Sequence, residues 1–172
     1  LINSFKDYFR QNNQTIYENP SPGNKEGGIT TLEDKSLGAI QKGGQATIVD
    51  VLGYGEQCQE AGLNLLWSPG NDLVSSSALG MSGCHMVLFT TGRGTPFGSF
   101  VPTLKIASNT PLYLRKQNWM DFNAGTVLEQ NSFDEAKAAL IAKVLAVAEG
   151  EKALHETYGN KEIAIFKSGV TL

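Results

Sequence analysis

One stretch of the chain, from Ser68 to Gly98, most constrains what this sequence can fold into. It starts with a turn, runs through a segment of small residues with helical character, and enters the apolar run at 86–89. A polar, glycine-rich loop at 90–96 follows. A loop, a helix, a strand and a loop in this order are typical of a parallel α/β sheet. Ligands of such sheets bind beyond the carboxyl ends of the strands, where we expect Arg93 to lie.

The same alternation of strands and helices continues from about Ala46 to the end of the chain. The apolar run at 46–52 fits either a strand or a helix, whereas Ser132 and Glu135 have the spacing of a capping box. Together these segments predict an α/β fold with a parallel sheet. The other expected elements are strands at 62–67, 102–107, 119–125 and 162–166, a helix at 111–118 that Asn109 or Thr110 caps, and a helix at 132–155 that Gly150 can break.

The first part of the chain differs from this pattern. Residues 1–17 place aromatic side chains on one face of a short amphipathic helix, and that face needs a partner to cover it. Residues 18–28 contain two prolines and three glycines, a composition that predicts a loop or linker. A helix is then expected from a threonine cap, with Glu33 at the capping-box spacing from Thr30, and it ends near Gly43.

Composition and charge restrict the class of protein and its partners. The chain has 172 residues, of which 41% are hydrophobic and 18% charged, as in an ordinary globular domain. Its net charge of -3, without clusters of Lys and Arg, argues against nucleic acid or an anionic membrane as the main partner. No apolar run approaches the roughly 20 residues that span a membrane. We expect Cys58 and Cys84 to be thiols in a reducing cytoplasm.

Several familiar catalytic motifs are absent from the sequence. It contains no phosphate-binding P-loop, no dinucleotide-binding GxGxxG turn and no GxSxG nucleophile elbow. His85 and His155 lie far apart in the sequence, and neither has the spacing of a zinc site. What remains is a set of polar residues in loops.

These loop residues are open to two interpretations. Asn71 and Asp72 are expected to cap a helix. Cys84 fits a small buried thiol, a metal ligand or a reactive thiolate, and His85 beside it fits a structural histidine. Arg93 lies between two glycines, so it fits either a solvated cation or a guanidinium fork that holds a carboxylate.

Five stretches, taken together and in order, resemble the carboxyl-terminal part of the altronate and galactarate dehydratase family. The resemblance covers most of residues 18 to 130. The stretches are NPSPGNKEGGITTLEDKSLGAIQKGG (19–44), NLLWSPGND (64–72), SGCHMVLFTTGRGTPFG (82–98), PTLKIASNT (102–110) and DFNAG (121–125).

The resemblance implies a domain organisation and a set of partners. Residues 18–172 would be the carboxyl-terminal α/β domain of a longer dehydratase, a Rossmann-like variant with three layers and a mostly parallel sheet. Residues 1–17 would be a helical extension from a preceding region. The implied partners are a small-molecule sugar acid and the remaining domains of the same polypeptide, with a homodimer left open.

The implied activity is the elimination of water from a sugar acid, with D-altronate to 2-keto-3-deoxy-D-gluconate as the first choice. The proton alpha to the carboxylate leaves first, and the neighbouring hydroxyl follows. The resemblance also implies dependence on a divalent metal, here expected to be Fe²⁺, with Mn²⁺ or Mg²⁺ as alternatives. The competing interpretations are galactarate dehydration, a sulfolactate lyase-type elimination, or a non-catalytic domain that binds a sugar acid.

On this basis we expect three groups of site residues, although the sequence leaves the choice of general base open. A cation placed near the substrate carboxylate would stabilise the negative charge that develops when the alpha proton leaves. The expected residues are Lys25, Glu33 and His85 for catalysis, Asn24, Arg93, Thr95 and Asn123 for substrate binding, and Asp72, Cys84 and Asp121 for the metal.

Overall fold

The computed structural model describes residues 1–16, 20–129 and 132–169. The chain divides into two compact units. Unit 1 consists of residues 1–54, 58–67 and 167–172, and unit 2 of residues 55–57 and 68–166. The predicted domain boundary after residue 17 lies outside the described residues, and it stays a prediction.

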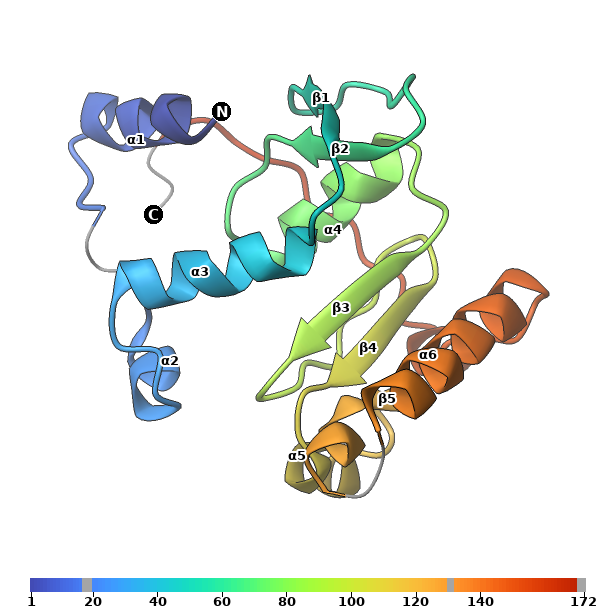
Figure 1. Ribbon diagram of the computed structural model, residues 1–172. Coiled ribbons are helices and arrows are strands. Elements are labelled where there is room, and N and C mark those ends of the chain that lie inside the picture. The colour runs from blue at the N-terminus through green and yellow to red at the C-terminus, as the bar shows by residue number, and fades with distance from the viewer. Residues whose placement is uncertain (17–19, 130–131, 170–172) are drawn as a thin grey trace. The chain divides into compact units, whose positions relative to one another are not determined.

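Unit 1 combines three helices with a small parallel sheet (Figure 1). In this sheet Leu52 is paired with Leu66. The predicted aromatic face of the first helix is covered, because the rings of Phe5 and Tyr8 lie 5.4 and 6.4 Å from the Trp67 ring. The elements are α1 (Ile2–Gln11), α2 (Pro22–Glu26), α3 (Leu32–Gly43), β1 (Ile48–Leu52) and β2 (Leu63–Leu66).

Two predictions for unit 1 need correction. Residues 18–28 are not a simple linker, because the short helix α2 forms there with Pro22 in its first turn, where the fixed φ of proline favours a helix start. Helix α3 is capped by Thr31 rather than Thr30. The Thr31 hydroxyl accepts a hydrogen bond from the Asp34 amide at 3.1 Å, so the cap lies one residue later than the spacing of Glu33 suggested.

Unit 2 contains a three-stranded parallel sheet in the order β3-β4-β5. Thr91, Ala107 and Asn123 are aligned across it, so the carboxyl ends of the three strands share one edge. Every residue of β4 is buried, which requires cover on both faces. The elements are α4 (Asp72–Met81), β3 (Val87–Thr91), β4 (Thr103–Ala107), α5 (Thr110–Arg115), β5 (Phe122–Asn123), the 3-10 helix η1 (Ala124–Leu128), α6 (Phe133–Ala148) and α7 (Leu154–Thr157).

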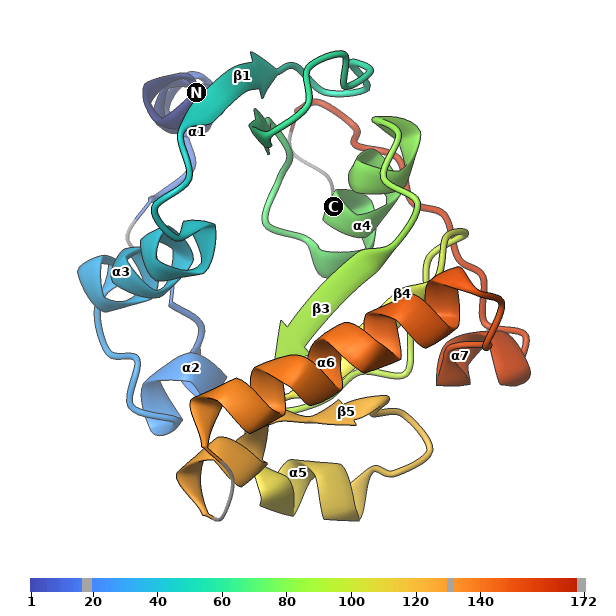
Figure 2. The same ribbon diagram turned by 45° about the vertical axis from the view of Figure 1, so that its right-hand side comes forward.

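The helices of unit 2 pack on this sheet and confirm the α/β prediction. Helix α4 contacts β3, and α5 contacts β4 and β5, while α6 runs beside the sheet (Figures 1 and 2). Leu112, Met120 and Ala107 form a buried cluster under α5. The parallel sheets confirm the predicted fold class, whereas the closer likeness to a Rossmann fold stays a prediction.

The predicted helix starts in unit 2 are confirmed. The Asn71 side chain accepts a hydrogen bond from the Val74 amide at 3.2 Å, and Asn109 accepts one from the Leu112 amide at 2.9 Å. Ser132 caps α6 in a capping box with Glu135. Each of these caps depends on a short local sequence pattern, so it could be predicted from the sequence.

The end of unit 2 agrees with one prediction and differs from another. The long helix ends at Ala148, beside the break expected at Gly150, which has a positive φ of 111°, and α7 is a separate helix. The expected strand at 162–166 is wrong. Its only ladder contact among the described residues is an isolated bridge between Glu162 and Ser99, because the Ala164 amide donates to the Ser77 hydroxyl instead of a neighbouring strand.

No helix in the described part of the chain is both long and apolar enough to cross a membrane.

Candidate functional site

The carboxyl edge of the unit 2 sheet presents Arg93. The Thr91 hydroxyl accepts hydrogen bonds from the Arg93 and Gly94 amides at 3.3 and 2.9 Å, and this turns the chain as it leaves β3. The Lys116 ammonium donates to the Arg93 carbonyl at 2.8 Å and lies 4.4 Å from the centre of the Trp119 ring. The Arg93 side chain is exposed. The structure thus fixes the backbone of Arg93 and leaves its guanidinium in solvent.

Asn123 lies at the same edge, at the end of β5. Its side chain donates to the Thr110 hydroxyl at 3.1 Å and accepts from the Gly125 amide at 3.0 Å. A Cβ on Gly125 would lie 2.2 Å from the Thr110 amide nitrogen, so only glycine permits this approach. The structure places Arg93 and Asn123 on one edge, with Thr95 in the loop that carries Arg93. Asn123 already holds α5 and η1 together, which is a structural task.

The predicted metal ligand Asp121 is also engaged within the fold. One carboxylate oxygen accepts a hydrogen bond from the Lys105 amide at 2.8 Å, and the other accepts one from the Leu154 amide at 2.7 Å. These bonds tie the start of β5 to the middle of β4 and to the start of α7.

The three predicted metal ligands lie at different points of unit 2. Asp72 begins α4 and Cys84 follows its end, and a helix of 10 residues separates them by about 15 Å. The described residues contain no group of three His, Cys, Asp or Glu side chains that could hold a metal ion. The dependence on Fe²⁺, Mn²⁺ or Mg²⁺ therefore stays a prediction for the whole protein.

The two histidines have different surroundings. His85 is exposed and precedes β3, so it lies at the amino end of the strand whose other end leads to Arg93. His155 is 1% exposed. Its Nε2 accepts a hydrogen bond from the Thr103 amide at 2.9 Å, so its Nδ1 is the donor to the Asn160 carbonyl at 2.7 Å. His155 is a structural residue that the sequence analysis did not single out.

Sequence reasoning also missed Lys105, which is 1% exposed in the middle of β4. Its ammonium donates to the carbonyls of Pro96 and Phe97 at 3.1 and 2.9 Å. Burial lowers the pKa of Lys105, and the charges of Asp121 and Glu162 oppose this shift. The signal in the sequence was a single lysine within an otherwise apolar strand.

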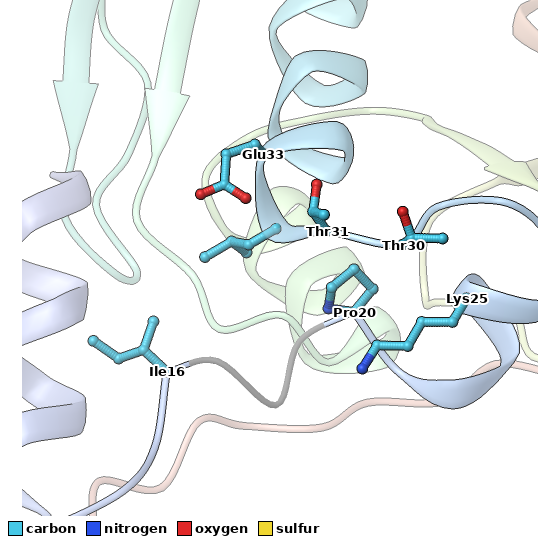
Figure 3. Close-up of a pocket in the computed structure, with 7 residues that line it drawn as sticks. Ile16, Pro20, Lys25, Thr30, Thr31 and Glu33 are labelled. Atoms are coloured by element: carbon cyan, nitrogen blue, oxygen red, sulfur yellow. The ribbon is translucent and has the colours of Figure 1, made fainter.

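Unit 1 contains a pocket of about 310 Å³ that brings two predicted catalytic residues together (Figure 3). Lys25 reaches it from α2, and Glu33 reaches it from the first turn of α3. Both side chains belong to exposed residues. Ile16, Pro20 and Leu32 add apolar walls, and Thr30 and Thr31 add hydroxyls.

The polar residues around this pocket are held by local bonds. The Asp34 carboxylate accepts a hydrogen bond from the Thr30 hydroxyl at 3.3 Å. The hydrogen bond with the Thr31 side chain is the main reason that the pKa of Asp34 is lowered. Asn24, predicted to bind substrate, donates to the Ser21 hydroxyl at 2.7 Å. An amine and a carboxylate beside one pocket supply the groups that proton transfer requires.

A fold of this class with polar groups at the strand ends is shared by many proteins, and comparison with known sequences defines the family. Residues 1–171 match the family described as D-galactarate/Altronate dehydratase, C-terminal. The chain belongs to this family.

Its relatives include two altronate dehydratases. The protein of Bacillus subtilis (strain 168) is 58% identical over 100% of this chain and 35% of its own length. The protein of Escherichia coli (strain K12) is 55% identical over the same shares. A galactarate dehydratase (L-threo-forming) of Escherichia coli (strain K12) is 36% identical over 94% of this chain and 32% of its own length. The chain thus spans about one third of the length of these relatives.

Proposed function

We propose that the whole protein containing this chain is a hydro-lyase that removes water from a sugar acid, converting D-altronate to 2-keto-3-deoxy-D-gluconate. The observation that carries the proposal is Arg93, an exposed guanidinium on a fixed backbone at the carboxyl edge of a parallel sheet. Identity of 58% to an altronate dehydratase favours the substrate.

The chemistry places clear demands on such a residue. When the alpha proton leaves, the electron pair moves toward the carboxylate, and the charge on its oxygens increases. The hydroxyl on the next carbon then departs as water, and the resulting enol becomes the 2-keto-3-deoxy acid. A guanidinium that forms two parallel hydrogen bonds with the carboxylate stabilises this charge and fixes the orientation of the substrate.

Two residues of unit 1 suit the proton transfers. Lys25 and Glu33 line the same pocket within unit 1, so they are the candidates for a general acid and base that this unit offers. His85 is the weaker choice. The five residues of β3 separate it from the segment of Arg93, a strand length of about 16 Å, whereas the alpha carbon is bonded directly to the carboxylate that Arg93 would hold.

A divalent metal, with Fe²⁺ as first choice, would polarise the carboxylate in the whole protein. Both carboxylate oxygens of Asp121 accept hydrogen bonds from backbone amides. We therefore propose that the ligands of this metal come largely from other parts of the polypeptide. A sugar acid and those further domains are the partners that we propose.

The test is steady-state kinetics of the whole protein on D-altronate. We expect Arg93→Ala to lower kcat/KM at least about a hundredfold, the loss typical of removing a charge that stabilises a transition state. Arg115→Ala is the matched control, since Arg115 is an exposed arginine in the last turn of α5, and it should turn over normally. Unchanged kinetics for Arg93→Ala would remove Arg93 from the site.

Galactarate is the second candidate substrate, favoured by the relative that is 36% identical. Galactarate has a carboxylate at each end, so a second cation would be needed for its far end. If the whole protein converts galactarate faster than D-altronate, galactarate becomes the first candidate substrate and D-altronate the second.

A further inference from the structure

Lys105 is buried in a way that lysine rarely is. It occupies the centre of β4, where every residue is buried, and it is 1% exposed. Lysine is almost never fully buried unless its charge has partners. Asp121 and Glu162 attract this charge, but both hydrogen bonds of the ammonium go elsewhere. They go to the backbone that connects β3 with β4.

The contacts of this backbone form a continuous series. The Pro96 carbonyl accepts from Lys105 and also from the Asn160 side chain at 3.2 Å. The Phe97 carbonyl accepts from Lys105, and the Gly98 carbonyl accepts from the Glu162 amide at 2.8 Å. Three consecutive carbonyls are therefore bound, and the Phe97 ring packs edge-on against Phe89 at 5.1 Å.

The other end of the segment is held as well. The Thr91 hydroxyl and the Lys116 ammonium fix the backbone around Arg93, as described above. Arg93 and Thr95 thus lie between two anchors, one at the strand end and one at residues 96–98. Of these anchors, only the second depends on a buried charge.

We propose that Lys105 is a positioning residue, whose buried ammonium holds the segment 92–98 in the shape that presents Arg93 at the edge of the sheet. It acts through the backbone and does not touch the substrate. Its effect on turnover rests on the proposed function, whereas its effect on the segment does not. The two can therefore fail separately.

The first experiment measures the segment directly by amide hydrogen exchange in the whole protein. Lys105→Met keeps the length of the side chain and removes the ammonium, so the Pro96 and Phe97 carbonyls lose this donor. We expect the amides of residues 93–95 and 97–99 to exchange at least about tenfold faster, with β4 unchanged. Lys137→Met is the control, because Lys137 is an exposed lysine whose ammonium pairs with Asp134, and it should leave exchange unchanged.

Unchanged exchange at residues 93–95 and 97–99 in Lys105→Met would overturn the proposal. So would an equal acceleration throughout unit 2, because this would make Lys105 a general stabiliser of the fold. If Lys105→Met does not fold, Lys105→Gln is measured in its place. Its neutral amide can donate to only one or two acceptors at a shorter reach, so the same local acceleration is expected and the same two outcomes contradict it.

The second experiment asks whether Lys105 acts through Arg93. We expect Lys105→Met to raise KM for D-altronate about tenfold, with a smaller change in kcat, and to cause no further loss in an Arg93→Ala background. Equal losses in both backgrounds would overturn the positioning role. If Arg93→Ala alone leaves turnover unchanged, the proposed function fails at Arg93, and the exchange experiment still decides what Lys105 holds.

Discussion

The pocket of unit 1 and the carboxyl edge of unit 2 are built by different kinds of contact. Around the pocket, hydrogen bonds join near neighbours in the sequence, such as Asn24 to Ser21 and Asp34 to Thr31. At the edge, local bonds such as Gly94 to Thr91 are supplemented by bonds between distant segments, such as Lys116 to Arg93 and Asn160 to Pro96. The first region depends on local helix starts, and the second depends on the whole packed unit.

This difference bears on what each region can do. A backbone held by distant contacts keeps its position when a charged substrate binds, while the side chain that it carries stays free to rotate toward the substrate. This suits a residue that orients a carboxylate, as we propose for Arg93. Exposed groups on local helix turns keep rotamer freedom and contact with water, which suits the proton exchange that we propose for Lys25 and Glu33.

The largest expected effect concerns the packing of unit 2. A Cβ on Gly98 would lie 1.9 Å from Nδ1 of the buried His155 ring, so we expect Gly98→Ala to lower the free energy of unfolding by about 3 kcal/mol. Urea denaturation measures this. Gly38→Ala in unit 1 is the control, since a Cβ there meets nothing within 4 Å and should stabilise α3 by up to about 1 kcal/mol. Equal stability of the two variants would contradict the comparison.

The second effect concerns Asp121. Asp121→Asn removes one of the two acceptors that bind the Lys105 and Leu154 amides, so a loss of about 2 kcal/mol is expected in thermal or urea unfolding. Asp72→Asn serves as control, because Asp72 is exposed at the start of α4 and should cost less than about 1 kcal/mol. If Asp121→Asn were as stable as the original chain but failed to bind metal in the whole protein, Asp121 would be a ligand instead.

The third effect compares the helix caps of the two units. Thr31 caps α3 in unit 1 and Ser132 caps α6 in unit 2, each by accepting an amide hydrogen bond. Replacing either by alanine should cost about 1 kcal/mol. Because both caps are local hydrogen bonds, the loss of stability should be the same in unit 1 and in unit 2. A much larger loss for Ser132→Ala would mean that even this start is held by tertiary contacts.

The smallest effect is a dependence on pH. The hydrogen bond from the Ser132 amide lowers the pKa of Glu135, and the Thr31 side chain lowers the pKa of Asp34. A carboxyl whose folded pKa is lowered stabilises the fold above its unfolded pKa, and this stabilisation is lost as the pH falls through the folded value. Glu135→Gln should therefore destabilise near neutral pH and destabilise less in acid at about pH 3. Urea titrations at both pH values test this, and an effect that is equally large in acid would contradict the assignment.

Much of the fold could be predicted because its signals are local. The caps at Asn71, Asn109 and Ser132 and the apolar runs of the strands are short sequence patterns, and the structure confirms them. The expected strand at 162–166 has a suitable pattern but no neighbour to pair with. Its amides bond to Gly98 and to the Ser77 side chain, and only the tertiary structure reveals this.

The site divides in the same way. Arg93 could be singled out because flanking glycines are visible in the sequence, and the structure places it after β3 as expected. Lys105 and His155 could not, because their role depends on carbonyls and amides that are distant in the sequence. Asp121 was expected to bind a metal because the family resemblance implies one and a carboxylate is a hard oxygen donor. Its hydrogen bonds to the distant Lys105 and Leu154 amides could not be read from the sequence.

The central claim is that Arg93 holds the substrate carboxylate, and a crystal structure of the whole protein tests it most directly. The ligand is the analogue of D-altronate that lacks the 3-hydroxyl, which cannot lose water. The account predicts that its carboxylate lies about 3 Å from the Arg93 guanidinium nitrogens, in two parallel hydrogen bonds. A carboxylate bound by other residues, with Arg93 still in solvent, would contradict it.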